Sequence, residues 1–229
     1  FTHSDAFSMS SSFSPSFELP SSEGYFCMVE NPKGNFSANH CNFEQDQAKN
    51  MIVHVIRTNF TNFIEEDRCG GAIQIINYAF ECTSVWFSNC ITKSCGGGSI
   101  YIKNYLDLEY NVTKDNVTVK ECQALYGGGI YIYCESEENE VRITRSIFSL
   151  NIATLTSKTD EHKDLFGGAH IFLTAKHSFV KDCTFEKGKG KSGVKIYNEF
   201  DSSKSILLQN AENNKNELMI SGCSFEIDN

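Results

Sequence analysis

The stretch Cys69-Gly70-Gly71-Ala72-Ile73-Gln74-Ile75 decides the fold, because the chain repeats it. Two small residues precede a short run in which apolar and polar side chains alternate. Glycine permits the backbone conformations and the close backbone approach that a tight corner requires. Alternation with period two predicts a short strand with one buried face. Further copies of this corner-and-strand unit lie at residues 97–102, 127–132 and 167–172, and a less regular copy lies at residues 192–196.

The glycines of these copies are the predicted corner residues. They are Gly70, Gly71, Gly97, Gly98, Gly127, Gly128, Gly167 and Gly168. We expect the second glycine of each pair, that is Gly71, Gly98, Gly128 and Gly168, to form one column.

A second unit precedes each corner, most clearly as Val180-Lys181-Asp182-Cys183-Thr184-Phe185. Its copies predict that several cysteines share one repeat column, either as buried small side chains or as disulfide partners: Cys41, Cys90, Cys122, Cys183 and Cys223. The first corner glycines stand at 70, 97, 127 and 167, so the repeat steps are 27, 30 and 40 residues. Uneven steps between short strands are typical of a solenoid with loop insertions. We predict an all-β, right-handed parallel β-helix of about seven coils stacked roughly 4.8 Å apart. A Gly-rich β-sandwich is the alternative.

The repeats also set the expected domain organisation. Residues 1–26 are rich in Ser and Phe and are predicted to form an N-terminal arm or cap, with the β-helix domain over residues 27–229. The polar insertion at 154–164 lengthens the third step and is a candidate binding loop. Since the sequence starts at Phe1 and stops within a coil, we expect a processed or trimmed piece of a longer protein, or a chain docked to a partner.

Two motifs resemble those of a known family. The Gly-Gly-Ala-Ile of residues 70–73 and the Phe-x-x-Asn of residues 148–151 are similar to the repeat motifs of chlamydial polymorphic outer-membrane proteins, which also occur in trichomonad surface proteins. The resemblance covers roughly residues 36–225, although Asp46, Gly188 and Asp228 replace the asparagine in three copies. It implies a surface-exposed parallel β-helix used in adhesion or surface architecture, and it implies no catalytic residues.

Composition narrows the classes of function. The net charge of −9 and the pI of about 5.2 argue against nucleic-acid binding. No apolar run approaches the ~18 residues of a membrane span. Ten cysteines are present without a Cys-x-x-Cys motif, so neither a metal site nor a cofactor is expected.

The cysteines and sequons favour an extracellular or cell-surface location. Cys69 and Cys95 each precede a glycine corner one coil apart, within disulfide reach if the coils stack, and they are the candidate disulfide. Candidate N-glycosylation sites are Asn35, Asn111 and Asn116. A fourth sequon, at Asn59, is expected to point inward and so to be unusable.

The outward positions of the strands favour a binding protein over an enzyme. In the predicted register, one outward column has no carboxylate: Gln74, Tyr101, Tyr131, Ile171 and Lys195. Glycoside hydrolysis needs a carboxylate pair, so we expect no enzyme. Tyr101 and Tyr131 are the candidate ligand face, because stacked aromatic rings can hold sugars. Ring stacking that merely supports the ladder is the simpler alternative.

The predicted function is therefore a non-catalytic surface or extracellular β-helix for adhesion or structural support. Its expected partner is a host-cell or neighbouring surface protein, or a glycan. A glycan-binding or polysaccharide-degrading β-helix is one alternative, and a structural subunit docked in a larger assembly is another.

Overall fold

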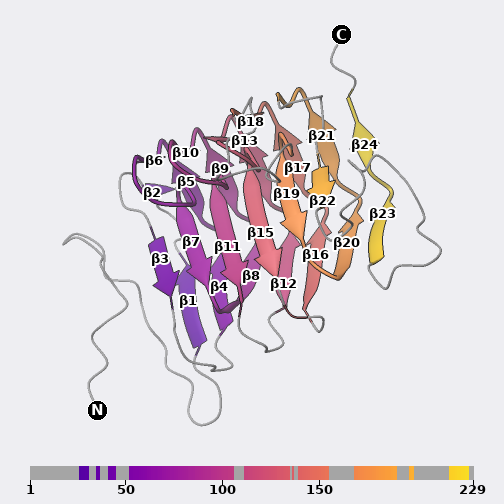
Figure 1. Cartoon of the computed structure of the whole chain (residues 1–229), viewed down its shortest axis with the longest axis horizontal. Coiled ribbons are helices and arrows are strands. Elements are labelled where there is room, and N and C mark those ends of the chain that lie inside the picture. Colours follow the sequence, from indigo (N-terminus) through magenta and orange to yellow (C-terminus); the bar gives the residue numbers. More distant parts are fainter. Residues whose placement is uncertain are drawn as a thin grey trace, which may run out of the picture.

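The computed structural model describes residues 26–30, 35–36, 41–44, 52–105, 111–134, 136, 139–154, 168–189, 196–198 and 217–226. Within these residues the chain forms β-strands and turns and contains no helix. Figure 1 shows the strands side by side along the long axis of the molecule. The predicted arm at 1–26 and the predicted binding loop at 154–164 lie almost entirely outside the described residues.

The strands belong to four sheets, named here A, B, C and D. Sheet A contains β1 (Phe26–Glu30), β4 (Ile52–Ile56), β8 (Ala79–Thr83), β12 (Val112–Asp115), β16 (Glu140–Thr144), β20 (His177–Lys181) and β23 (Glu217–Ser221). Sheet B contains β2 (Asn35–Phe36), β5 (Asn59–Thr61), β9 (Trp86–Ser88), β13 (Thr118–Lys120), β17 (Ile147–Ser149), β21 (Thr184–Glu186) and β24 (Ser224–Phe225). Sheet C contains β3 (Cys41–Glu44), β7 (Ile73–Ile76), β11 (Ile100–Asn104), β15 (Ile130–Cys134), β19 (Ile171–Thr174) and β22 (Ile196–Asn198). Sheet D contains β6 (Ile64–Glu65), β10 (Ile91–Thr92), β14 (Gln123–Ala124) and β18 (Ile152–Ala153).

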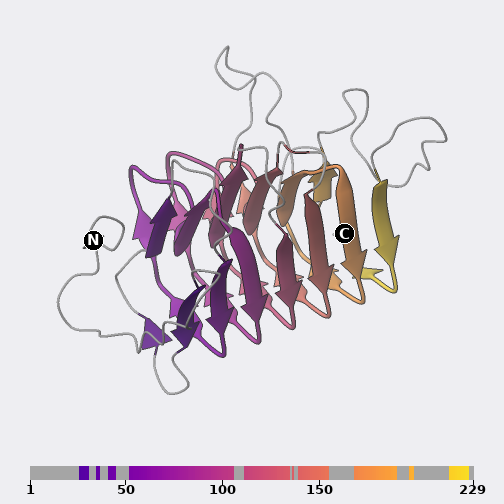
Figure 2. The same ribbon diagram turned by 90° about the horizontal axis from the view of Figure 1, so that it is seen from below.

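From β4 to β19 the chain visits the sheets in the order A, B, D, C and then returns to A one strand further along. In the coils β1–β3 and β20–β22 the described residues form no strand of sheet D. Every pairing within a sheet is parallel, and it joins strands that hold the same place in successive coils. Figure 2 shows the resulting stack of coils from a second direction. The predicted parallel β-helix is therefore confirmed.

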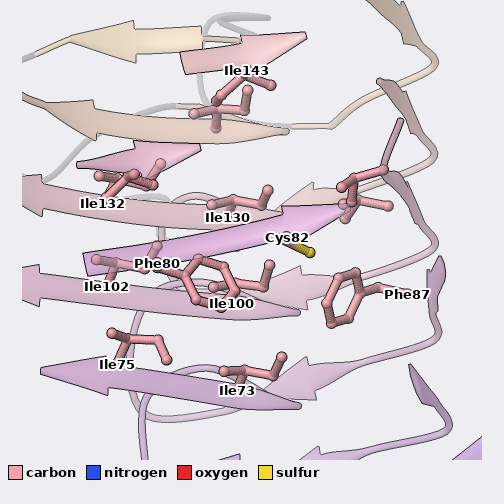
Figure 3. Packing of buried hydrophobic residues seen from close by; sticks show 14 of the residues in the cluster. Ile73, Ile75, Phe80, Cys82, Phe87, Ile100, Ile102, Ile130, Ile132 and Ile143 are labelled. Carbon is pink, nitrogen blue, oxygen red and sulfur yellow. The ribbon is translucent and has the colours of Figure 1, made fainter. Parts of the chain in front are cut away.

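The core fills the inside of the coils with ladders of like side chains. Ile73, Ile100, Ile130 and Ile171 follow one another in register on sheet C, as do Ile75, Ile102, Ile132 and Leu173. Figure 3 shows several of these isoleucines lying one above another, with Phe80 and Phe87 beside them. The inward phenylalanines of sheet B stack face to face, with ring centroids 4.9 Å apart for Phe60–Phe87 and 5.0 Å for Phe148–Phe185. Stacking like on like buries apolar area along the whole axis.

The corner between sheets A and B is turned by a single residue with positive φ. Successive coils place Arg57, Ser84, Asn116, Arg145 and Asp182 there, with φ between 47° and 56°. These residues are exposed, so a side chain is tolerated despite the strained backbone. The corner between sheets D and C differs, because its positive-φ residue is always glycine: Gly70, Gly97, Gly127 and Gly168.

The strand register corrects the predicted glycine column by one residue. Ile171 pairs with Ile130, so Gly168 is equivalent to Gly127 rather than to Gly128. Ala169 then takes the place of the second glycine, and Gly167 lies outside the described residues. The same shift puts Phe172, not Ile171, in the outward column of sheet C, and Tyr197, not Lys195, is the residue that pairs with Phe172.

The predicted single column of cysteines is also wrong. Cys90 and Cys122 follow the strands of sheet B, whereas Cys183 and Cys223 precede them. Cys41 lies in sheet C opposite Ile73. The two groups look alike because each cysteine follows a positive-φ residue and donates to the carbonyl two residues back, as Cys122 Sγ does to Lys120 O (3.3 Å) and Cys183 Sγ to Lys181 O (3.3 Å). The same local arrangement, a positive-φ residue followed by a cysteine, thus occurs at two different corners of the coil.

Candidate binding face

Tyr101 and Tyr131 lie on the outer face of sheet C and stack on each other, with ring centroids 4.7 Å apart. Phe172 extends the stack at 5.0 Å from Tyr131. The stack is not an open surface, since Tyr101 is only 8% exposed and Tyr131 only 5%. The prediction of an exposed ligand face at these residues is therefore wrong, and the rings support the ladder instead.

Two features cover this aromatic stack. Tyr126 packs edge-on against Tyr131, with centroids 5.2 Å apart. Cys69 and Cys95 form a disulfide with Cα atoms 4.9 Å apart, and both pack against the aromatic cluster. The Cys95 Sγ lies 3.6 Å from the Tyr126 hydroxyl. Burial raises the pKa of Tyr101 and of Tyr126, so both phenols stay protonated at neutral pH.

The outer face of sheet A is polar, and several of its carboxylates are ion-paired. Glu81 contacts His54 Nδ1 at 2.8 Å. Asp115 pairs with Arg145, and Glu140 pairs with Arg142. Burial lowers the pKa of His54, against the opposing influence of Glu81.

His170 holds, on its coil, the position of Ala72, Ser99 and Gly129, one residue before the first isoleucine of the sheet C strand. It is fully buried, and its Nδ1 lies 3.0 Å from Asn151 Nδ2. Among the described residues, no group of three or more His, Cys, Asp or Glu side chains could hold a metal ion. The same part of the chain has no helix long and apolar enough to cross a membrane.

The sequence analysis did not predict that a lysine, Lys114, would be buried. Lys114 is inward-facing on β12, fully buried, and in register with Cys82. Its Nζ finds no hydrogen-bond partner within the described part of the chain and lies 4.6 Å from the centre of the Phe80 ring. Burial lowers its pKa to about 8, although the nearby thiols of Cys82 and Cys134 favour the charged form. Lys114 stands at an inward position in the alternation of its strand, and this pattern could have identified it as a buried lysine.

Most of the exposed large apolar side chains lie elsewhere, on sheets B and D. Seven large apolar side chains of the described residues are exposed, and five of them belong to sheet B, sheet D or the corner between them. Four of them, Ile64, Trp86, Ile147 and Leu150, are called the outer apolar stripe below, whereas Phe225 continues the inward ladder of Phe185 on the last coil. Trp86, Thr118 and Ile147 follow one another in register on adjacent strands of sheet B. A sheet face with this composition is a candidate contact surface.

The structure places the sequons as follows. Asn111 and Asn116 are exposed, and the side chain of Asn35, in β2, lies outside what is described. Asn59 is also exposed, on the outer face of sheet B, so the expectation that it points inward is wrong. Its neighbour Phe60 is the residue that enters the core.

Neither protein-family models nor curated proteins nor solved structures provide a match to this chain. The fold and the surface described above are therefore the basis for a functional proposal.

Proposed function

We propose that this chain is a non-catalytic β-helix of an extracellular or cell-surface protein, which contacts a partner protein or a glycan and holds it on a rigid scaffold. The observation that carries the proposal is the outer apolar stripe. Trp86 is 44% exposed and Ile147 is 45% exposed, both on a regular sheet that runs along the stacked coils. Exposed aromatic and aliphatic side chains on a rigid face are typical of contact surfaces.

Three further features support this proposal. The Cys69–Cys95 disulfide fits an oxidising compartment. The exposed sequons fit a secreted protein. The repeat motifs resemble those of polymorphic outer-membrane proteins, which implies surface adhesion.

Glycan binding is the second candidate, and it is favoured by the side chains around Trp86. Thr118 stands beside Trp86 on the next strand, and Ser88 and Lys120 follow on the same face. A sugar ring can stack on the indole while neighbouring hydroxyl and ammonium groups bind its hydroxyls.

The experiment measures adhesion of beads coated with the purified protein to epithelial cell monolayers, alongside a glycan array and a depolymerisation assay on acidic polysaccharides. We expect the double variant Ile147→Ser, Leu150→Asn to lose adhesion. Met219→Ser is the matched control, because Met219 is 54% exposed on sheet A. Equal adhesion of both variants would refute the stripe as the contact surface. Polysaccharide turnover would overturn the non-catalytic assignment.

A further inference from the structure

We propose that Asn59 is an N-glycosylation site and that the first sugar of its glycan packs on Trp86. The sequon is Asn59-Phe60-Thr61. Phe60 is fully buried, and side chains alternate along β5, so Asn59 and Thr61 share the outer face of sheet B. The strand thereby presents both residues of the acceptor motif to solvent.

The Asn59 amide is free to carry a sugar. Asn59 is exposed, and its side chain makes no hydrogen bond to another described residue. Asn116, in another sequon, differs in this respect: its Nδ2 donates to Ser84 Oγ at 3.0 Å, and its φ is 53°. A sugar on Asn116 would compete with that contact, whereas a sugar on Asn59 would break no hydrogen bond to another described side chain.

Trp86 stands directly beside Asn59. The two residues are paired in register on β5 and β9, so their Cα atoms are separated by about one strand spacing, ~4.8 Å. Trp86 is the single tryptophan of the chain and is 44% exposed. Its indole N–H has no hydrogen-bond partner among the described residues. An indole offers a flat apolar face to the C–H side of a sugar ring and an N–H donor to a sugar hydroxyl.

The attachment is a substitution at the anomeric carbon of a lipid-diphosphate-linked oligosaccharide. A bond forms between Asn59 Nδ2 and that carbon, while the bond from the carbon to the diphosphate oxygen breaks. The lipid diphosphate leaves with the electron pair, and one Nδ2 proton passes to a base of the transferase. The glycan would cover Trp86, so an external sugar could not stack on the same indole, and it would leave Ile147 and Leu150, on a later coil, open to a partner protein.

Site occupancy is tested by secreting the chain from a eukaryotic cell line and mapping tryptic peptides after enzymatic deglycosylation in heavy-oxygen water. Cleavage after Arg57 and Arg68 gives the peptide 58–68, which contains no sequon other than that of Asn59. We expect isotope-labelled aspartate at position 59, and its loss in Thr61→Ala, which keeps Asn59 but removes the motif. An unmodified peptide 58–68 in the secreted protein would overturn the proposal, whatever the adhesion assays show.

Contact between the sugar and Trp86 is tested by fluorescence and melting temperature. Because Trp86 is the single tryptophan, a red shift of its emission on deglycosylation reports newly exposed indole. We expect deglycosylation to lower the melting temperature of the native chain by about 2–4 °C. In Trp86→Ala, deglycosylation should no longer lower the melting temperature. In Ile147→Ala, at an equally exposed apolar position of the same face, it should lower the melting temperature as it does in the native chain. Unchanged emission on sugar removal would refute the packing.

Discussion

Asn151 Oδ1 accepts a hydrogen bond from the backbone N–H of Cys122 on the preceding coil, at 2.9 Å. The same side chain donates from Nδ2 to Val119 O, also at 2.9 Å. Asn151 is fully buried, so its amide satisfies backbone groups that have no access to water. The asparagine of the Phe-x-x-Asn motif thus ties two successive coils together at the corner between sheets B and D.

Replacing Asn151 with Ala should destabilise the fold by about 2–4 kcal/mol, because buried donors and acceptors lose their partners. Chemical unfolding of the purified variant measures the loss. The control is Asn111→Ala, at an exposed asparagine, which should change stability by no more than about 0.5 kcal/mol. Equal effects at both positions would show that the coil-to-coil bridge is not important.

Much of the fold could be predicted because its causes are local. Alternating side chains and glycine corners recur with each coil, and each coil repeats the same backbone geometry. The register was harder to predict. The run Gly167-Gly168-Ala169-His170-Ile171 fits the glycine pattern in two ways, and only the pairing of Ile171 with Ile130 selects one. Counting back from the strand, rather than forward from the glycines, would have given the correct column.

Exposure could not be predicted from the repeats alone. Tyr101 is outward-facing by parity, yet it is buried by Tyr126 of the next coil and by the Cys69–Cys95 disulfide, which joins its own coil to the preceding one. Asn59 was misplaced for a different reason. The positive φ of Arg57 resets the alternation at the corner, so parity must be counted again from Phe60.

Gly98 should not tolerate even a methyl group. A Cβ there would collide with the backbone carbonyl of Gly128 and with the backbone of Gln123, neither of which can move without disturbing its coil. We expect Gly98→Ala to cost about 1–3 kcal/mol in thermal or urea unfolding. The matched control is Ala169→Gly, at the equivalent position two coils on, where the loss should be about 0.5–1 kcal/mol. A neutral Gly98→Ala would contradict the close coil contact.

The Cys69–Cys95 disulfide should stabilise the protein and keep the aromatic stack covered. It spans 26 residues, and a loop of this length corresponds to about 3–4 kcal/mol in the chain-entropy description. The double variant Cys69→Ser, Cys95→Ser should unfold at lower urea concentration and show greater quenching of tyrosine fluorescence by iodide. Cys223→Ser, at a partly exposed free cysteine, is the control and should change neither readout appreciably. Unaltered quenching in the double variant would mean that Tyr126 alone covers the stack.

Lys114 should destabilise the protein at neutral pH, because its ammonium is fully buried without a hydrogen-bond partner in the described structure. Burial lowers its pKa from 10.5 to about 8, and this difference corresponds to about 3 kcal/mol. Lys114→Met keeps the length of the side chain and removes the charge, so at pH 7 it should stabilise the fold by up to that amount. Lys93→Met, which removes an exposed ammonium paired with Glu66, should change stability by less than about 1 kcal/mol.

The advantage of Lys114→Met should disappear as the pH rises. Below about pH 8 the lysine is protonated in both the folded and the unfolded chain, and the full cost of burying the charge is present. Between about pH 8 and 10.5 the folded chain releases the proton while the unfolded chain still holds it, so the native protein gains stability with increasing pH. The thiols facing Lys114, those of Cys82 and Cys134, have pKa values raised to about 12 by burial and do not titrate in this window in the folded state. Urea unfolding of both proteins at intervals from pH 7 to about pH 10 tests the expectation: their free energies of unfolding should converge, and a constant difference would show that Lys114 is not a buried, titrating charge.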